Sequence, residues 1–358
     1  MKILFLADGP SVHTQKWINF FSAKRHVIDL ITFRPSHQKN IHRIYYIDVG
    51  EIKSSGNNFQ YIFAIPKILK ILMSNRYDAV VAHYATSYGF LTSLLKKHFY
   101  LVVHGSDIKL TPQKNIFYYF LTGFVLRRAS FIFSVAHHIT QDLNLSYKIP
   151  LNKIHTAQYG VNLQKFINKK PLKDRKYHIV TNRSFIPNSN YPFFIEIIAR
   201  LKVKFPEIQV LIFGDGPLKN KIQELIQRFE LQNNVELLST QTEEEVIRLL
   251  NDSKIFVSLT SSDGTSLSLL EAMACGNFPV VSDITANREW ILDNENGILL
   301  PLFNLDFAVE RIANVLAGDY PKVFYDKNIK LLKAKADYVK NMSEIEKIII
   351  NKMGTVLK

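Results

Sequence analysis

The chain has 358 residues, of which 47% are hydrophobic, so it is long and apolar enough to form two ordinary cores. It contains no apolar run of the roughly 18 residues needed to span a bilayer, and its start, MKILFLADG, is typical of a strand rather than of a signal peptide. Cys275 is the single cysteine, which excludes an intramolecular disulfide and a cysteine-rich metal site and is consistent with a reducing cytosol.

Charge is unevenly distributed along the chain. Residues 1–176 contain 25 Lys and Arg against 8 Asp and Glu, a net charge of +17, whereas the remainder contains 20 against 23, a net charge of −3. A strongly basic half favours a polyanion or an anionic membrane surface as partner, and a merely solvated basic face is the alternative.

The first half alternates strands and helices. It opens with the strand KILFLAD, a loop over residues 9–14, a helix around 15–22 and the strand HVIDLITF. Further apolar strands are predicted at 77–84, 100–105 and 130–136. This alternation is typical of a parallel sheet covered by helices on both faces, and such sheets bind ligands at the carboxyl ends of their strands.

A second alternating series follows the Lys-rich segment 165–176, which we interpret as a short linker able to hinge. Its strands are predicted at 177–182, 208–214, 234–239, 254–260 and 278–283. A long amphipathic helical region is expected over about 326–352. The predicted division is a first domain of residues 1–168, completed by a C-terminal helix of about 338–358 that packs back onto it, and a second domain of residues 169–337.

The most informative segment is TSSDGTSLSLLEAMACGNFPVVSD, residues 260–283. An apolar strand leads into a polar loop and then into a short helix whose one charge is Glu271, eight residues after Asp263. The apolar residues of this helix face every direction, so the helix is expected to be buried and Glu271 to be a buried carboxylate in need of a partner. The helix begins at the carboxyl end of a strand, where its free N–H groups and dipole favour a phosphate. A structural βαβ unit is the alternative.

Other polar residues follow strands of the first half. His104 ends the strand YLVVHG and should emerge at the carboxyl edge, where Gly105 permits a tight turn and Asp107 orients the ring or caps a helix. Gly9, Ser11 and His13 occupy the first strand-to-helix loop, a usual place for phosphate or sugar contacts, although no GxGxxG dinucleotide fingerprint is present.

Two features of the second half are expected at the corresponding edge of its sheet. Arg183 follows the strand YHIVTN and carries a delocalised charge suited to a diphosphate. The sequence GDGP, residues 214–217, follows another strand and allows close approach of backbone or ligand; a plain turn is the alternative. The adjacent His137 and His138 would face different directions on a helix and make a poor metal pair.

The segment PQKNIFYYFLTGFVLRR, residues 112–128, combines aromatic residues with flanking cations, as an interfacial helix would. Apolar residues occupy most of its circumference, so an ordinary buried helix is the favoured alternative.

Taken together, these stretches resemble glycosyltransferase family 4, the retaining nucleotide-sugar transferases of GT-B architecture. The resemblance covers nearly the whole chain and is strongest from GDGPLKNKIQELIQRFELQNNVELL through the 260–283 segment to NREWILDNENGILLP, with weaker blocks at VVHGSD, SVAHHITQDL and YGVNLQKF. It implies an α/β fold of two Rossmann-like parallel-sheet domains facing across a cleft.

By resemblance, Asp263 and Glu271 correspond to the family's paired acids, with Asp replacing the commoner Glu at the first position. Asn190 lies nearest the place of the usual phosphate-binding Lys, as in a subset with an Asp-Gly-Thr-Ser loop. Asp263 and His104 are the implied catalytic residues, and His13 and Asp107 are acceptor or loop candidates. The implied donor site comprises Gly9, Ser11, Arg183, Asn190, Thr240, Gln241, Thr265, Ser266, Leu267 and Glu271.

The resemblance implies metal-independent transfer, without a cofactor, of a sugar from a UDP- or GDP-sugar to a lipid-linked oligosaccharide, lipopolysaccharide or capsule precursor. The expected location is the cytoplasm, peripheral on the inner face of the plasma membrane, with the basic N-terminal half meeting anionic lipid and no nucleic acid bound. The alternatives are another GT-B enzyme, such as a sugar epimerase or a DNA-modifying glycosyltransferase, and a non-enzymatic polyanion-binding module.

Overall fold

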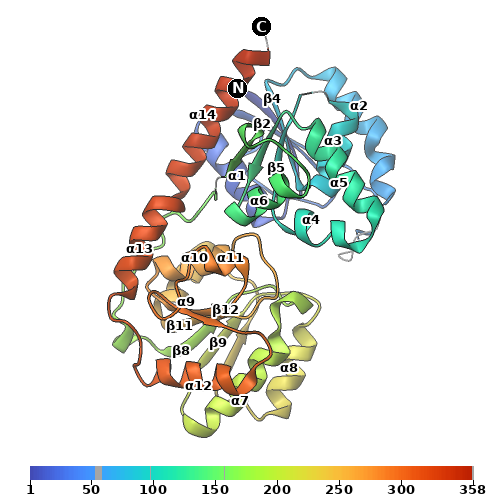
Figure 1. The fold of residues 1–358 in the computed structure, drawn as a ribbon. Coiled ribbons are helices and arrows are strands. Elements are labelled where there is room, and N and C mark those ends of the chain that lie inside the picture. The colour runs from blue at the N-terminus through green and yellow to red at the C-terminus, as the bar shows by residue number, and fades with distance from the viewer. Residues whose placement is uncertain (53–58, 97, 157, 357–358) are drawn as a thin grey trace. The chain divides into compact units, whose positions relative to one another are not determined.

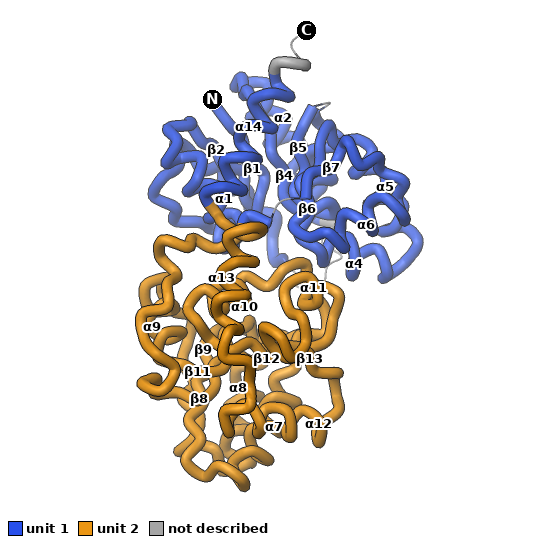
Figure 2. The backbone as a smooth tube through the Cα atoms, turned by 60° about the vertical axis from the view of Figure 1, so that its left-hand side comes forward, with its two compact units in different colours: residues 1–159, 339–358 blue, residues 160–338 orange. Residues whose placement is uncertain are grey.

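The computed structural model describes residues 1–52, 59–96, 98–156 and 158–356 and divides the chain into two compact units (Figures 1 and 2). Unit 1 comprises residues 1–159 and 339–358, and unit 2 comprises residues 160–338. Each unit is a Rossmann-like α/β domain built on a parallel sheet, which confirms the predicted fold class.

Within the described residues, unit 1 contains a 7-stranded parallel sheet in the order β3-β2-β1-β4-β5-β6-β7. The strands are β1 (Lys2–Leu6), β2 (Val27–Thr32), β3 (Arg43–Tyr46), β4 (Ala79–His83), β5 (Tyr100–Val103), β6 (Phe131–Ser134) and β7 (Ile154–Thr156). The helices are α1 (Val12–Ala23), α2 (Ile65–Ser74), α3 (Phe90–Leu95), α4 (Ser106–Lys109), α5 (Ile116–Arg128), α6 (His137–Leu145) and α14 (Tyr338–Val356), with short helical turns η1 (Phe59–Ala64), η2 (Tyr84–Gly89), η3 (Pro112–Lys114) and η4 (Leu151–Lys153).

Helices cover both faces of this sheet. On one face, α2, α3 and α5 contribute Ile68, Leu91 and Val125 to a core that includes Leu4 and Leu101 of the strands. On the other face, Trp17 of α1 packs edge-on against Phe5 and Phe133, and the hydroxyl of Tyr100 donates to the carbonyl of Ile349 in α14. The C-terminal helix therefore belongs to unit 1.

Unit 2 contains, within the described residues, a 6-stranded parallel sheet in the order β10-β9-β8-β11-β12-β13. The strands are β8 (Tyr177–Thr181), β9 (Val210–Phe213), β10 (Val235–Leu238), β11 (Ser253–Ser258), β12 (Phe278–Ser282) and β13 (Ile298–Leu300). The helices are α7 (Tyr191–Lys204), α8 (Lys219–Arg228), α9 (Glu243–Asn251), α10 (Leu267–Ala274), α11 (Thr285–Arg288), α12 (Leu305–Leu316) and α13 (Phe324–Lys335), with turns η5 (Leu172–Asp174) and η6 (Pro187–Ser189).

The strands that the sequence did not predict, β3, β7 and β13, all lie at sheet edges. They have only three or four residues, and most of β3 and β7 is not buried. An edge strand has one neighbour and less apolar surface to bury, so its sequence carries a weaker hydrophobic signal than a central strand.

The interpretation of residues 165–176 as a hinged linker is wrong. The segment lies inside unit 2, where Arg175 is 3% exposed and its guanidinium donates to the carbonyls of Lys170, Ser253 and Cys275. Burial lowers the pKa of Arg175 to about 10. The units divide between residues 159 and 160 rather than at the predicted 168/169 boundary.

The helical region expected over about 326–352 consists of two helices, α13 and α14, separated at Ala336 and Asp337. The backbone groups that the break frees are bonded to Val161: its N–H donates to Ala336 O at 2.9 Å, and its carbonyl accepts from Tyr338 N at 3.1 Å. Val161 therefore replaces two hydrogen bonds that a continuous helix would have made.

Candidate active site

Arg183 is fixed at the carboxyl end of β8. Its backbone N–H donates to the hydroxyl of Tyr191 at 3.2 Å, and that hydroxyl donates to the Arg183 carbonyl at 2.8 Å. Tyr191 is the first residue of α7 and is buried beside Phe185. The loop that carries Arg183 is thus attached to the adjoining helix at a single, well-packed side chain.

The guanidinium of Arg183 lies at the N-terminus of α10. One terminal nitrogen, Nη1, donates to Ser266 Oγ at 2.7 Å and to Ser268 Oγ at 3.0 Å, and Nη2 is paired with Asp263 Oδ2 at 2.6 Å. Ser266 also caps the helix by accepting from Leu269 N. A cation, a helix N-terminus and one carboxylate therefore meet at the carboxyl edge of the sheet, an arrangement that can bind an anion.

The prediction that Glu271 is buried is wrong. It is the one residue of α10 that is not buried, whereas Leu267, Leu269 and Met273 are in the core. The helix packs against β11, β12 and α13, and the side chain of Glu271 is left partly exposed. It is four residues beyond the first helical residue, roughly 6 Å along the axis, so its carboxylate can reach a group attached to an anion at the helix N-terminus.

Asn190 lies at the same edge and joins two loops. Its Nδ2 donates to Leu259 O at 2.6 Å and to Ser261 Oγ at 2.8 Å, which ties the start of α7 to the loop that carries Asp263. Its φ of 51° is in the left-handed region, which Asn adopts more readily than Lys does.

The remaining candidates of unit 2 are at the same edge. Thr265 is buried immediately before the Ser266 cap, and Leu267 begins α10. Thr240 and Gln241 follow the end of β10, where Gln241 Nε2 donates to Ser239 O at 2.9 Å. The structure therefore brings all the candidates of unit 2 to the carboxyl edge of one sheet.

The GDGP segment supports the Arg183 loop. Gly214 and Gly216 have positive φ values of 153° and 149°. A Cβ at Gly214 would lie 2.6 Å from Arg183 O, and one at Gly216 would lie 2.7 Å from Phe185 O. The two glycines therefore allow the loops after β8 and β9 to touch, and their role is close approach of backbone to backbone.

In unit 1, His104 directly follows β5 at the carboxyl edge, as predicted, and Asp107 holds the loop that follows. Its carboxylate accepts from the N–H groups of His104 and Gly105, each at 3.0 Å, and from Ala85 N at 2.8 Å. Asp107 therefore ties the β5 loop to the β4 loop through the backbone, and it is His83 that hydrogen-bonds to the His104 ring.

His104 belongs to a cluster of aromatic rings. Its Nε2 lies 3.3 Å from Nδ1 of His83, its ring stacks on Tyr84 at 4.3 Å, and the ring of His13 is 5.2 Å away. The hydroxyl of Tyr159 is hydrogen-bonded to Nδ1 of His13. Burial, with a smaller effect of His13, lowers the pKa of His83 to about 3, and burial and the two neighbouring histidines hold the pKa of His104 well below its usual value.

Both members of the His83–His104 pair are therefore neutral near pH 7, and each ring offers one donor and one acceptor nitrogen. The sequence analysis missed His83 and Tyr84. The signal was available, because they end the strand YDAVVAHY just as His104 ends YLVVHG, but it required knowing that β4 and β5 are neighbours.

The first loop of unit 1 is anchored to the end of β2. Gly9 N donates to Thr32 Oγ1 at 3.0 Å, and Gly9 O accepts from Gln38 Nε2 at 2.8 Å. Ser11 precedes α1 as its N-cap residue, and His13 lies in the first turn of α1. These candidates thus share the carboxyl edge with His104.

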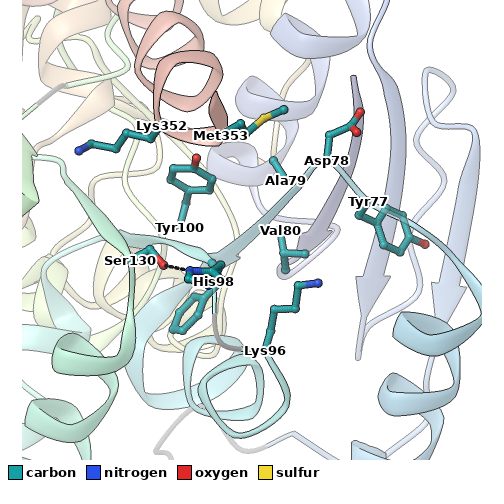
Figure 3. Close-up of a pocket in the computed structure, with 11 residues that line it drawn as sticks. Tyr77, Asp78, Ala79, Val80, Lys96, His98, Tyr100, Ser130, Lys352 and Met353 are labelled. Carbon is teal, nitrogen blue, oxygen red and sulfur yellow. Dashed lines mark hydrogen bonds between the residues drawn. The ribbon is translucent and has the colours of Figure 1, made fainter. Parts of the chain in front are cut away.

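A cavity of about 410 Å³ lies at the amino ends of the strands of the unit 1 sheet (Figure 3). It is lined by residues that begin β4 and β5, including Ala79 and Tyr100, and by Lys352 and Met353 of α14. Since His83 and His104 are at the opposite ends of the same two strands, this cavity is separate from the candidate site.

Comparison with known proteins agrees with this geometry. Residues 163–336 match the family model of glycosyl transferases group 1, and residues 2–136 match that of glycosyl transferase 4-like proteins. The uncharacterized glycosyltransferase MJ1178 of Methanocaldococcus jannaschii is 22% identical over 330 residues, which cover 90% of this chain and 88% of that protein.

A second relative is the UDP-Gal:alpha-D-GlcNAc-diphosphoundecaprenol alpha-1,3-galactosyltransferase of Escherichia coli, 25% identical over 273 residues that cover 69% of this chain and 68% of that protein. Among solved structures, Anabaena Alr3699/HepE in complex with UDP and glucose superposes with a TM-score of 0.77 at 15% identity, covering 98% of this chain and all of that one. The two family models match residues in both units, and together with the fold they show that the chain is a glycosyltransferase of the GT-B type.

Proposed function

We propose that this glycosyltransferase transfers a sugar from a nucleoside-diphosphate donor to a membrane-associated glycan precursor, with retention at the anomeric carbon. The observation that carries the donor assignment is the position of the Arg183 guanidinium, held by Ser266, Ser268 and Asp263 at the N-terminus of α10. The solved structure of HepE, which has the same fold, contains UDP and glucose, and this supports a UDP-sugar as the donor.

In this proposal the donor diphosphate binds Arg183 and the free N–H groups at the start of α10. The ribose hydroxyls bind Glu271 one turn further on, and the base lies near Thr240 and Gln241 at the end of β10. The bond between the anomeric carbon and the diphosphate oxygen breaks, a bond to the acceptor hydroxyl oxygen forms on the same face of the sugar, and the hydroxyl proton passes to the departing diphosphate. A fixed cation and a helix N-terminus stabilise the charge that develops on the leaving diphosphate, so no metal ion is required.

Asp263 and His104 are the proposed catalytic residues. Asp263 is directed at the Arg183 guanidinium and would face the sugar once a diphosphate competes for that cation. His104, neutral and paired with His83, can donate or accept one hydrogen bond with the donor sugar or with the acceptor hydroxyl. Asp107 then acts by fixing the His104 backbone.

The acceptor in this proposal is a lipid-linked or lipopolysaccharide glycan, reached from the inner face of the plasma membrane. The name of the Escherichia coli relative describes a diphosphoundecaprenol-linked acceptor, and residues 1–176 of this chain carry a net charge of +17. The structure contains, in its described part, no helix long and apolar enough to cross a bilayer, so the proposed association is peripheral.

The donor assignment is tested by thermal-shift screening against UDP-, GDP-, ADP- and CMP-sugars. A donor at 100 times its Kd stabilises the folded protein by about 2.7 kcal/mol. We expect Glu271→Ala to abolish transfer, and both Glu271→Ala and Arg183→Ala to lower the affinity for the donor nucleotide by at least about tenfold.

The matched control is Arg288→Ala. Arg288 also forms a bidentate pair with an aspartate of unit 2, Asp283, but its side chain is 63% exposed. The Arg288→Ala variant should bind the donor as the unchanged protein does. Calorimetry that finds equal affinity for every nucleoside diphosphate in all four proteins would remove the donor assignment.

A further inference from the structure

The helices that cover one face of unit 1 form a layer with an apolar outer surface. In this layer α3 contacts both α2 and α5 (Figure 1). Their inner residues, Ile68, Leu91, Val125 and Leu126, belong to the core. The outer side of the same layer should therefore be polar if it is simply solvated.

It is instead rich in large hydrophobic side chains. On α5, Phe117 and Phe120 are 55% and 65% exposed, and Phe124 and Ile116 are also exposed. In and beside α2, Phe63 and Met73 are 81% and 78% exposed. The outer apolar surface, as we call it, consists of Ile62, Phe63, Leu69, Met73, Leu94, Ile116, Phe117, Phe120 and Phe124. An apolar surface that extends over three adjacent helices marks an interaction site.

The charges of the layer indicate the partner. Helix α2 carries Lys67 and Lys70, α5 ends with Arg127 and Arg128, and none of α2, α3 and α5 contains an acidic residue. Over residues 59–130 the sequence has nine Lys and Arg against two Asp, a net charge of +7. A second copy of the chain would bring like charges together, whereas an anionic lipid surface is complementary to both the apolar and the cationic side chains.

We infer that the outer apolar surface docks unit 1 onto an anionic lipid bilayer, with the Phe117 and Phe120 rings inserted among the acyl chains and the flanking cations at the headgroups. The inference rests on the proposed function, which includes association with a membrane. It names the surface of unit 1 that meets that membrane. The buried-helix prediction for residues 112–128 is correspondingly wrong for one side of α5.

The orientation suits an acceptor held in the membrane. Strands β5 and β6 are parallel, and α5 connects the end of one to the start of the other. Its first residues, including Ile116 and Phe117, therefore lie toward the carboxyl edge where His104 is placed. Docking through these residues brings the lipid surface close to the edge of unit 1 that carries the candidate catalytic histidine.

The test is flotation of the full chain with phosphatidylcholine vesicles with and without phosphatidylglycerol. We expect binding that needs the anionic lipid and weakens at high salt. The double variant Phe117→Ser/Phe120→Ser should lower the partition coefficient on the order of tenfold or more. The control Val203→Ser/Phe303→Ser replaces side chains of unit 2 that are 80% and 67% exposed and should float like the unchanged protein.

A second measurement reports insertion directly. Both native tryptophans, Trp17 and Trp290, are buried and out of contact with added lipid. A vesicle-induced change in the spectrum of a Phe120→Trp variant therefore reports on the emission of the introduced ring. It should shift to the blue with anionic vesicles and be quenched by brominated lipid.

Equal flotation of the two double variants, or no fluorescence shift, would overturn the inference. So would a dimer of the unchanged protein that the Phe117→Ser/Phe120→Ser variant dissociates, because the surface would then be a self-interface. None of these measurements uses a sugar donor, so their failure is distinct from failure of the donor screen.

Discussion

At the scale of single residues, the informative finding is that His104 pairs with His83 rather than with a carboxylate. The sequence placed His104 at a strand end and left two roles open for Asp107, orienting the ring or capping a helix. The carboxylate instead satisfies three backbone N–H groups, which a buried loop must pair in some way. The ring then pairs with a residue 21 positions earlier, brought there by the neighbouring strand.

The buried pair predicts how the stability of unit 1 depends on pH. Burial places the folded pKa of His83 and of His104 below the unfolded value of 6.5, so the unfolded chain binds more protons as the pH falls. The contribution of the two neutral histidines to the free energy of unfolding is therefore complete above about pH 6.5. It is lost as the pH decreases below that value, by up to about 1.4 kcal/mol per pH unit for each group.

We expect His83→Phe to reduce that slope between about pH 6 and pH 4 by about 1.4 kcal/mol per unit, measured by chemical denaturation at a series of pH values. The same replacement at His37, which is exposed, is the matched control. An unaltered slope in His83→Phe would show that this histidine is not buried neutral.

At the scale of elements, the site of unit 2 depends on loops that touch one another. The loop after β9 contacts the Arg183 loop through Gly214 and Gly216, and Asn190 ties the start of α7 to the loop after β11. Sequence patterns identified the strands and the glycines but left two roles equally open for GDGP: close approach of backbone or ligand, and a plain turn. A Cβ at either glycine would lie too close to Arg183 O or Phe185 O, so the structure supports close approach of backbone to backbone.

Gly214→Ala tests this coupling. The new Cβ would lie 2.6 Å from the Arg183 carbonyl, so the Arg183 loop must move. We expect a loss of at least about 2 kcal/mol in the free energy of unfolding and weaker donor-nucleotide binding.

Gly318→Ala is the matched control for Gly214→Ala. Gly318 also has a positive φ, 96°, but no atom of another part of the chain lies within 4 Å of the position that a Cβ would take there. Its replacement should therefore cost only the backbone strain of about 1–2 kcal/mol and leave nucleotide binding intact. Equal effects of the two variants on nucleotide binding would argue against loop coupling.

At the scale of the whole molecule, the chain forms two Rossmann-like units, and after completing unit 2 it returns to unit 1. Residues 160–338 form unit 2, and α14 then packs on unit 1 through Met342, Ile345 and Ile349, all 0% exposed. The helix also carries Glu346, paired with His26 at 2.6 Å. Stability of unit 1 therefore depends on the end of the chain.

Ile345→Ala should lower the free energy of unfolding of unit 1 by about 2–5 kcal/mol, the usual cost of truncating a fully buried isoleucine. Ile350→Ala, on the same helix but 46% exposed, should change it by no more than about 0.5 kcal/mol. Denaturant unfolding of both variants measures the difference. Similar small losses in the two would mean that α14 adds little to the core of unit 1.

Much of the fold could be predicted because it is encoded locally. Central strands such as FPVVS are apolar on both faces and every residue of β12 is buried, so a run of hydrophobic residues identifies them without further information. The edge strands β3, β7 and β13 could not be identified in this way. The family match excludes the non-enzymatic binding module, an alternative that composition had left open.

The sequence by itself determined two α/β units, a carboxyl-edge position for Arg183 and His104, and a helix start at Ser266, because strand periodicity, glycine turns and capping residues act over a few positions. Only the tertiary structure decided which side chains meet: His83 with His104, Arg183 with Asp263 and Ser268, and Val161 with the break between α13 and α14. It also decided that Glu271 lies outside the core and that three phenylalanines of α5 are exposed. Burial depends on what packs against a helix, and that information lies in distant parts of the chain.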